Sequence, residues 1–94
     1  MDLVKLKAFV VVAEELNFRK SAEILGMSQP LLTRLIASLE KELGTKLFER
    51  TTRSVYLTGA GVLLLKEARE IASAVGRIET EVRAVGKMKS GGLK

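Results

Sequence analysis

The last third of the sequence carries apolar residues at alternating intervals of four and three positions. The series consists of Leu64, Ala68, Ile71, Val75, Ile78, Val82 and Val85. This spacing places the side chains on one stripe of an α-helix, as in the seam of a coiled coil. Charged neighbours such as Lys66, Glu70 and Arg77 fall outside the stripe. A helix of this length needs another surface to cover the stripe, so the pattern predicts a homodimer formed through these seven residues.

The bounds of this long helix follow from residues that start and stop helices. Thr58 is a favourable N-cap residue, and no proline occurs between it and Gly86. We therefore predict a linker, or dimerisation, helix over residues 59–87. Residues 88–94, which include a Gly-Gly pair, are predicted to form a flexible tail.

Two shorter helices are predicted in the first part of the chain. The first spans residues 3–16, with Asp2 as N-cap and an apolar stripe of Leu6, Phe9, Val10, Ala13 and Leu16. The second runs from Arg19 to Leu25 after the cap residue Asn17, and Gly26 ends it because glycine readily adopts the left-handed conformation.

A third helix has the clearest signals. Ser28 can cap it, Pro30 is tolerated in its first turn, and Gly44 ends it. Its apolar stripe contains Leu32, Leu35, Ile36, Leu39 and Leu43. Two short segments that tolerate β-structure follow, at residues 46–49 and 54–58, and predict a two-stranded hairpin.

Four residues around the second and third helices predict a helix-turn-helix. Ala22 is small enough to let the two helices cross closely, and Gly26 can adopt the backbone conformation that the turn between them needs. Leu32 and Leu35 form the inner face of the following helix. An ordinary helical hairpin is the alternative. Together with the hairpin, the pattern predicts a mainly α winged helix-turn-helix domain over residues 1–58.

Residues that can contact DNA lie outside the apolar stripe of the third helix. Gln and Arg can read base edges, Thr can contact bases or phosphates, and a helix N-terminus favours phosphate. No acidic residue occurs from Met27 to Leu39. The candidates are Ser28, Gln29, Pro30, Leu31, Thr33, Arg34 and Ser38. For Arg34, the alternative is an ordinary surface cation.

The tip of the predicted hairpin contributes a second set of candidates, Arg50, Thr52 and Arg53. Cations and small hydrogen-bond donors on such a turn are typical of a wing, which follows the phosphate backbone and can insert an Arg into a narrow minor groove. For Arg50, a structural salt bridge to Glu49 or Glu40 is an equal alternative.

Composition limits the function classes. The net charge of +5 favours a polyanionic partner without identifying one. The chain contains no Cys and no His, so we predict no metal, no cofactor and no enzymatic activity. The apolar run at residues 8–13 is too short to span a membrane or to act as a signal peptide, so we expect an unprocessed cytoplasmic protein.

A family resemblance rests on several motifs taken together. The run from Asn17 to Pro30, the pairs Leu39-Glu40 and Leu43-Gly44, and the segments 47–50 and 57–61 strongly resemble the N-terminal domain of LysR-type transcriptional regulators. The departures are Ser21, where the family usually has Ala, and Leu31, where many members have Pro or a small residue.

The resemblance implies binding of double-stranded promoter DNA by a dimer or tetramer, with Arg53 as the clearest wing contact. It also implies a small-molecule-binding domain after the linker helix, which is missing from this sequence. A winged helix that contacts protein instead of DNA, and an enzyme fragment with catalytic carboxylates, are the rival predictions.

Overall fold

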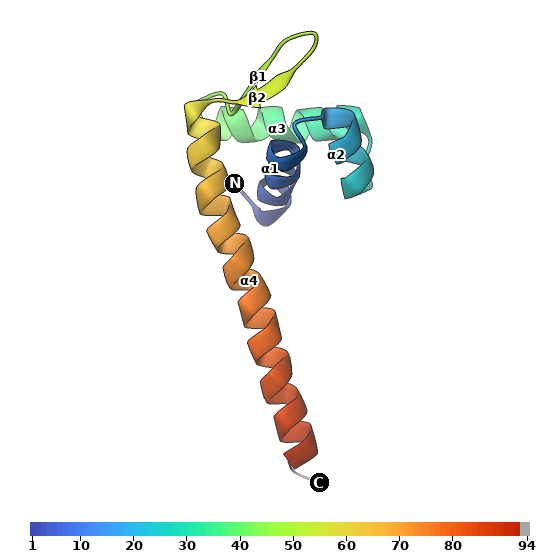
Figure 1. Cartoon of the computed structure of the whole chain (residues 1–94), viewed down its shortest axis with the longest axis vertical. Coiled ribbons are helices and arrows are strands. Elements are labelled where there is room, and N and C mark those ends of the chain that lie inside the picture. The colour runs from blue at the N-terminus through green and yellow to red at the C-terminus, as the bar shows by residue number, and fades with distance from the viewer. Residues whose placement is uncertain (93–94) are drawn as a thin grey trace.

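The computed structural model describes residues 1–92, with side chains described through Met88. In chain order the elements are α1 (Leu3–Glu15), α2 (Phe18–Leu25), α3 (Gln29–Leu43), β1 (Phe48–Arg50), β2 (Val55–Leu57) and α4 (Gly59–Gly92). A head formed by α1–α3 and the hairpin sits at one end, and α4 projects from it as a shaft (Figure 1). The radius of gyration is 17.0 Å, whereas a compact domain of this length would have about 12 Å. The predicted mainly α winged helix-turn-helix with a long terminal helix is confirmed.

Side-chain caps determine where the helices of the head begin. The side-chain oxygens of Asp2, Asn17 and Ser28 each accept a hydrogen bond from the backbone N–H three residues ahead, at 2.8, 2.8 and 3.2 Å. Gly26 and Gly44 end α2 and α3 with φ of 67° and 70°, which avoids the steric cost that other residues meet there. These caps and stops are as the sequence predicted, although α2 begins one residue earlier, at Phe18.

Leu16 corrects the predicted stripe of the first helix. It ends α1 in the left-handed conformation, with φ of 52°, and its side chain is 41% exposed. Because the chain turns at this residue, Leu16 does not continue the core face formed by Leu6, Phe9 and Ala13. The other four members of the stripe face the core or pack beside it.

The core of the head lies where α1, α2, α3 and the start of the hairpin meet. Ala22 and Leu32, two of the residues that predicted the helix-turn-helix, are buried there. The ring of Phe48 packs against Phe9 and Phe18, with centroid distances of 5.4 and 5.9 Å. Aromatic contacts of this kind add directional packing to the burial of apolar area. They attach the hairpin to α1 and α2.

An ion pair joins α1 to α3. The carboxylate of Glu42 accepts hydrogen bonds from the Lys5 ammonium and from the amino group of Met1. These partners lower the pKa of Glu42 to about 2 and raise the pKa of Lys5. Because the carboxylate is charged above its ordinary pKa of 4.5, the pair supports the fold at neutral pH and is lost only as the pH falls toward 2.

Thr58 connects the hairpin to α4. Its backbone N–H donates to the carbonyl of Leu47 at 3.0 Å, and its hydroxyl donates to the carbonyl of Lys46 at 2.7 Å. The same hydroxyl oxygen accepts from the N–H of Gly61 at 3.0 Å, which is the predicted N-cap. The first turn of α4 is therefore held directly against the residues that lead into β1.

The apolar stripe of α4 divides into two parts. Ala68 is 1% exposed and Leu64 is half-buried, because the head covers this end of α4. The dimer interface predicted over the stripe stays a prediction, and within the single chain Ala68 is already almost fully covered. The remaining five stripe residues, Ile71, Val75, Ile78, Val82 and Val85, are 41–64% exposed.

The end of α4 also differs from the prediction. The helix continues to Gly92, so the flexible tail predicted from residue 88 is wrong through residue 92, and residues 93–94 lie outside the described part. Lys87 and Met88 are good helix formers, and they extend the last turns past Gly86. Among the described helices, none has both the length and the apolar character that a membrane crossing requires.

Candidate nucleic-acid interface

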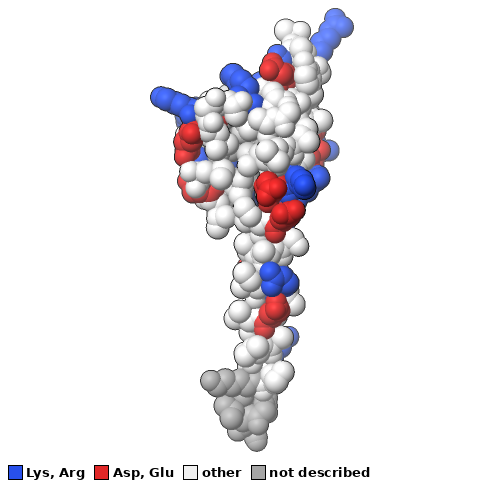
Figure 2. Space-filling model, turned by 90° about the vertical axis from the view of Figure 1, so that its left-hand side faces the viewer, with Lys and Arg blue, Asp and Glu red and all other residues white. Residues whose placement is uncertain are grey.

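The N-terminal half of α3 and the hairpin lie together at the end of the molecule opposite the tip of α4 (Figure 1). All ten residues that were predicted from the sequence to contact DNA are accessible to solvent. Thr33 and Ser38 are half-buried, and the other eight are exposed. In the view of Figure 2, Lys and Arg side chains project from this end and beyond the hairpin, and few charged side chains lie on the shaft. The geometry thus gathers the two sets of candidates on one surface.

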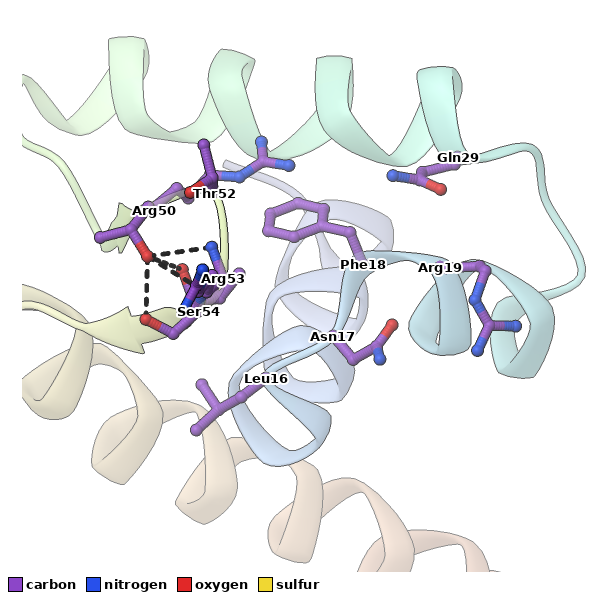
Figure 3. Close-up of a pocket in the computed structure, with 11 residues that line it drawn as sticks. Leu16, Asn17, Phe18, Arg19, Gln29, Arg50, Thr52, Arg53 and Ser54 are labelled. Carbon is purple, nitrogen blue, oxygen red and sulfur yellow. Dashed lines mark hydrogen bonds between the residues drawn. The ribbon is translucent and has the colours of Figure 1, made fainter.

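A polar cleft of about 290 Å³ joins the start of α3 to the hairpin. Its lining comes from the junction of α1 and α2, from Gln29 at the start of α3, and from residues 50–55 (Figure 3). Among the described residues, no carboxylate lines it. Such a surface can accept a phosphate without electrostatic repulsion, because its charged side chains are all arginines.

The arginines of this surface differ in their partners. Arg19 is paired with Glu23 at 3.1 Å. Arg34, Arg50 and Arg53 form no salt bridge within the part of the chain that the structure describes. Their guanidinium donors remain available for an external anion.

The salt bridge considered for Arg50 is absent from the described residues. Glu40 instead accepts hydrogen bonds from the backbone N–H groups of Leu47 and Phe48, at 2.8 and 3.3 Å, and lies 3.8 Å from Lys46. The Arg50 guanidinium lies over the ring of Phe18. Glu40 therefore binds residues at the start of the hairpin, as one of the alternatives suggested, but Arg50 is not one of its partners in the described part of the chain.

The hairpin tip is ordered by Thr51. Its hydroxyl oxygen accepts hydrogen bonds from the backbone N–H groups of Arg53 and Ser54, at 3.2 and 3.0 Å, and its own N–H donates to the carbonyl of Ser54 at 2.8 Å. Thr and Ser at this spacing often stabilise a tight turn. Thr51 lies in the predicted hairpin tip but is not one of the predicted DNA contacts. Thr52 and Arg53, which lie within this turn, are exposed and line the cleft (Figure 3).

The candidates on α3 occupy several positions around the helix. Gln29 shares the polar cleft with the hairpin, and Thr33 lines a second depression of about 220 Å³ together with Arg50. Pro30, Leu31, Arg34 and Ser38 line neither. Ser28 already uses its hydroxyl oxygen to cap α3. Gln29, Thr33 and Arg34 carry side chains of the types that hydrogen-bond base edges.

Seven residues that line the cleft were not predicted from the sequence as site residues. Three of them, Thr51, Ser54 and Val55, belong to the hairpin, and the others lie at the junction of α1 and α2: Leu16, Asn17, Phe18 and Arg19. Asn17 was assigned only a capping role, which the structure confirms. Phe18 directly follows the cap and is buried, so its apolar character alone would suggest core. Only the three-dimensional proximity of α2 to the hairpin reveals that these residues border the candidate interface.

An apolar groove of about 440 Å³ runs between α1 and α4, away from the polar cleft. Its walls include Leu3 and Val10 of α1 and Ile71 and Val75 of α4. Two charged residues, Lys7 and Glu79, border it. The groove is continuous with the exposed part of the α4 stripe.

Comparison with known proteins gives consistent results. Residues 3–62 match the family described as bacterial regulatory helix-turn-helix protein, lysR family. The transcriptional regulator TfdT of Cupriavidus pinatubonensis is 45% identical over all 94 residues, and XapR of Escherichia coli is 41% identical over 93 residues. This chain spans 41% of the length of TfdT and 32% of that of XapR.

Solved structures show the same architecture. The DNA-binding domain of BenM, in a complex with catB site 1 DNA, has a TM-score of 0.87 and 37% identity, and the match covers 92% of this chain and 96% of that one. The CbnR DNA-binding domain, also solved with DNA, has a TM-score of 0.83 and 41% identity, with coverages of 92% and 99%. With a family match over most of the head and relatives that are transcriptional regulators, this chain belongs to the LysR family of bacterial helix-turn-helix regulatory proteins.

Proposed function

We propose that this chain binds double-stranded promoter DNA with sequence preference, as the DNA-binding part of a transcription regulator that acts in the cytoplasm. The N-terminal half of α3 would enter the major groove, and the hairpin would lie as a wing over the flanking minor groove. The main support is the cleft that joins Gln29 to Arg50 and Arg53, in which no carboxylate of the described residues takes part. The BenM and CbnR domains with this fold were solved as complexes with DNA.

The proposed active form is a homodimer. The exposed stripe of α4 and the adjoining apolar groove together form an extended apolar surface on the shaft. A second copy of the same helix would cover this surface and present a second α3 to the DNA. The effector-binding domain and the tetramer implied by the family resemblance would be properties of a longer protein, and no catalytic role is proposed for this chain.

Arg34→Ala is expected to lower affinity for the preferred site by ~1 to 3 kcal/mol and to relax preference at one base position. Arg34 is exposed on α3 and forms no salt bridge among the described residues, so it can donate two hydrogen bonds to a guanine. Binding titrations against all single-base variants of the selected site measure the effect. Arg34→Lys is the matched control, because lysine keeps the positive charge but cannot form the two parallel hydrogen bonds of a guanidinium group. A uniform loss over all sequences would make Arg34 a phosphate contact.

Arg53→Ala is expected to weaken binding most on DNA whose flanks are rich in A·T pairs. Such flanks have a narrow minor groove with a strong negative potential, which attracts an inserted guanidinium. Fluorescence anisotropy with A·T-rich and G·C-rich flanks around one core site measures the difference. Arg83→Ala on the shaft removes the same charge at a distance and should affect neither duplex. Equal losses on both flanks would refute the minor-groove assignment of Arg53.

A further inference from the structure

The guanidinium of Arg50 rests on an aromatic surface. Its central carbon lies 4.0 Å from the centroid of the Phe18 ring, at the bend between α1 and α2. Phe18 is 5% exposed, whereas Arg50 belongs to the exposed residues of the hairpin. A cation over the face of an aromatic ring is attracted by the negative potential of that face. The contact therefore restrains a long side chain that would otherwise sample many rotamers.

This restraint leaves the hydrogen-bonding capacity of Arg50 intact. A stacked guanidinium uses its face, while its N–H donors point outward in the plane of the group. No carboxylate among the described residues pairs with Arg50. The donors stay available for a phosphate oxygen, and the restraint lowers the entropy that is lost when the side chain binds it.

The ring itself is well held, so it can serve as a fixed support. Phe18 packs edge-on against Phe48, and Phe48 packs against Phe9 in the core. Arg50 lies between the polar cleft and the second depression, and it lines both. Figure 3 shows Phe18 between the hairpin and the start of α3, with Gln29 nearby. The stack thus fixes a cation at the junction of the two DNA-contacting elements.

We propose that Phe18 is a positioning residue for DNA binding, acting through Arg50. Its ring holds the Arg50 guanidinium ready to donate to a phosphate beside the wing. This inference rests on the proposed function and adds a role for a residue that otherwise belongs to the hydrophobic core.

A double-mutant cycle on one selected DNA site tests the proposal. Phe18→Leu, Arg50→Ala and the double variant are compared with the parent chain by fluorescence anisotropy. We expect Phe18→Leu to weaken binding roughly three- to tenfold when Arg50 is present and to have almost no effect when Arg50 is already alanine. A merely structural role of Phe18 would produce the same fold-loss in both backgrounds and would overturn the proposal.

Phe9→Leu is the matched control. It removes another core ring that contacts Phe48 but does not touch Arg50. Any loss it causes should be equal with and without Arg50, and thermal unfolding establishes that each variant is folded at the temperature of the binding measurement. NMR of the DNA-free chain gives a second readout: the Arg50 side-chain protons should be shifted upfield by the Phe18 ring current in the parent and not in Phe18→Leu.

The outcomes separate the inference from the proposed function. A parent chain that shows no DNA sequence preference contradicts the proposed function. Specific binding that is unchanged in Arg50→Ala, or Arg50 protons without the ring-current shift, overturns the role of Phe18 and leaves the proposed function standing. If Phe18→Leu does not fold, Phe18→Tyr retains the ring and should keep both the shift and the affinity, and loss of either in the folded Tyr variant counts against the proposal.

Discussion

Val75→Glu is expected to separate the homodimer and to weaken binding to a two-half-site operator steeply. Val75 is 41% exposed in the single chain, lies in the middle of the α4 stripe and lines the apolar groove. In the proposed dimer the new carboxylate would be buried without a partner, at a cost of several kcal/mol, or about 100-fold or more in dimer affinity. Sedimentation velocity at micromolar concentrations compares the variant with the parent.

The head should remain folded in this variant, because Val75 lies on the shaft and outside the core of the head. A monomer presents only one α3, so the gain from simultaneous engagement of two half-sites, about 100-fold or more, would be lost. Thr80→Glu is the matched control, since it places the same charge on the opposite side of α4. A parent that is already monomeric, or a Val75→Glu variant that stays dimeric, would show that α4 packs in another way.

Gly61→Ala is expected to destabilise the head strongly. A Cβ atom at Gly61 would lie 2.2 Å from the carbonyl oxygen of Leu47 and 2.8 Å from the Leu57 side chain. The Leu47 oxygen is backbone and also accepts the hydrogen bond from Thr58, so it cannot move without disrupting the junction between the hairpin and α4. Overpacking of this kind costs about 3 kcal/mol.

Thermal unfolding followed by circular dichroism measures this effect. For a domain of this size the expected cost lowers Tm by roughly 10 °C or more. Gly59→Ala, two residues earlier in the same turn, is the control, because a Cβ there would meet nothing within 4 Å. It should be neutral or slightly stabilising, since alanine is the better helix former. Equal Tm values for the two variants would show that the first turn of α4 does not pack closely on Leu47.

The parts of the fold that depend on local interactions could be predicted from the sequence. Caps such as Ser28 and left-handed stops such as Gly26 and Gly44 act within one helical turn, so residue type and spacing define them. The helix-turn-helix followed from the same short-range signals. The candidates on α3 were accessible as expected because they lie outside a clear apolar stripe.

The features that depend on contacts between segments distant in the chain could not be predicted from the sequence. The stack of Arg50 on Phe18 and the close approach of Gly61 to Leu47 depend on how the hairpin packs against α2 and α4. Ala68 has the spacing of a dimer contact but is covered by the head, because spacing defines a helix face and not the element that covers it. Leu16 takes a left-handed conformation although it is not glycine, so no residue preference marked the end of α1.

Selection of bound duplexes from random DNA by the parent chain tests the central claim most directly. If α3 and the wing read DNA as a two-fold symmetric dimer, sequencing should show one enriched motif with two inverted half-sites. Repeating the selection with Arg34→Ala should erase the preference at one position of each half-site. The absence of any enriched motif, with weak binding that disappears at modest salt, would contradict the account and favour a winged helix whose third helix contacts protein.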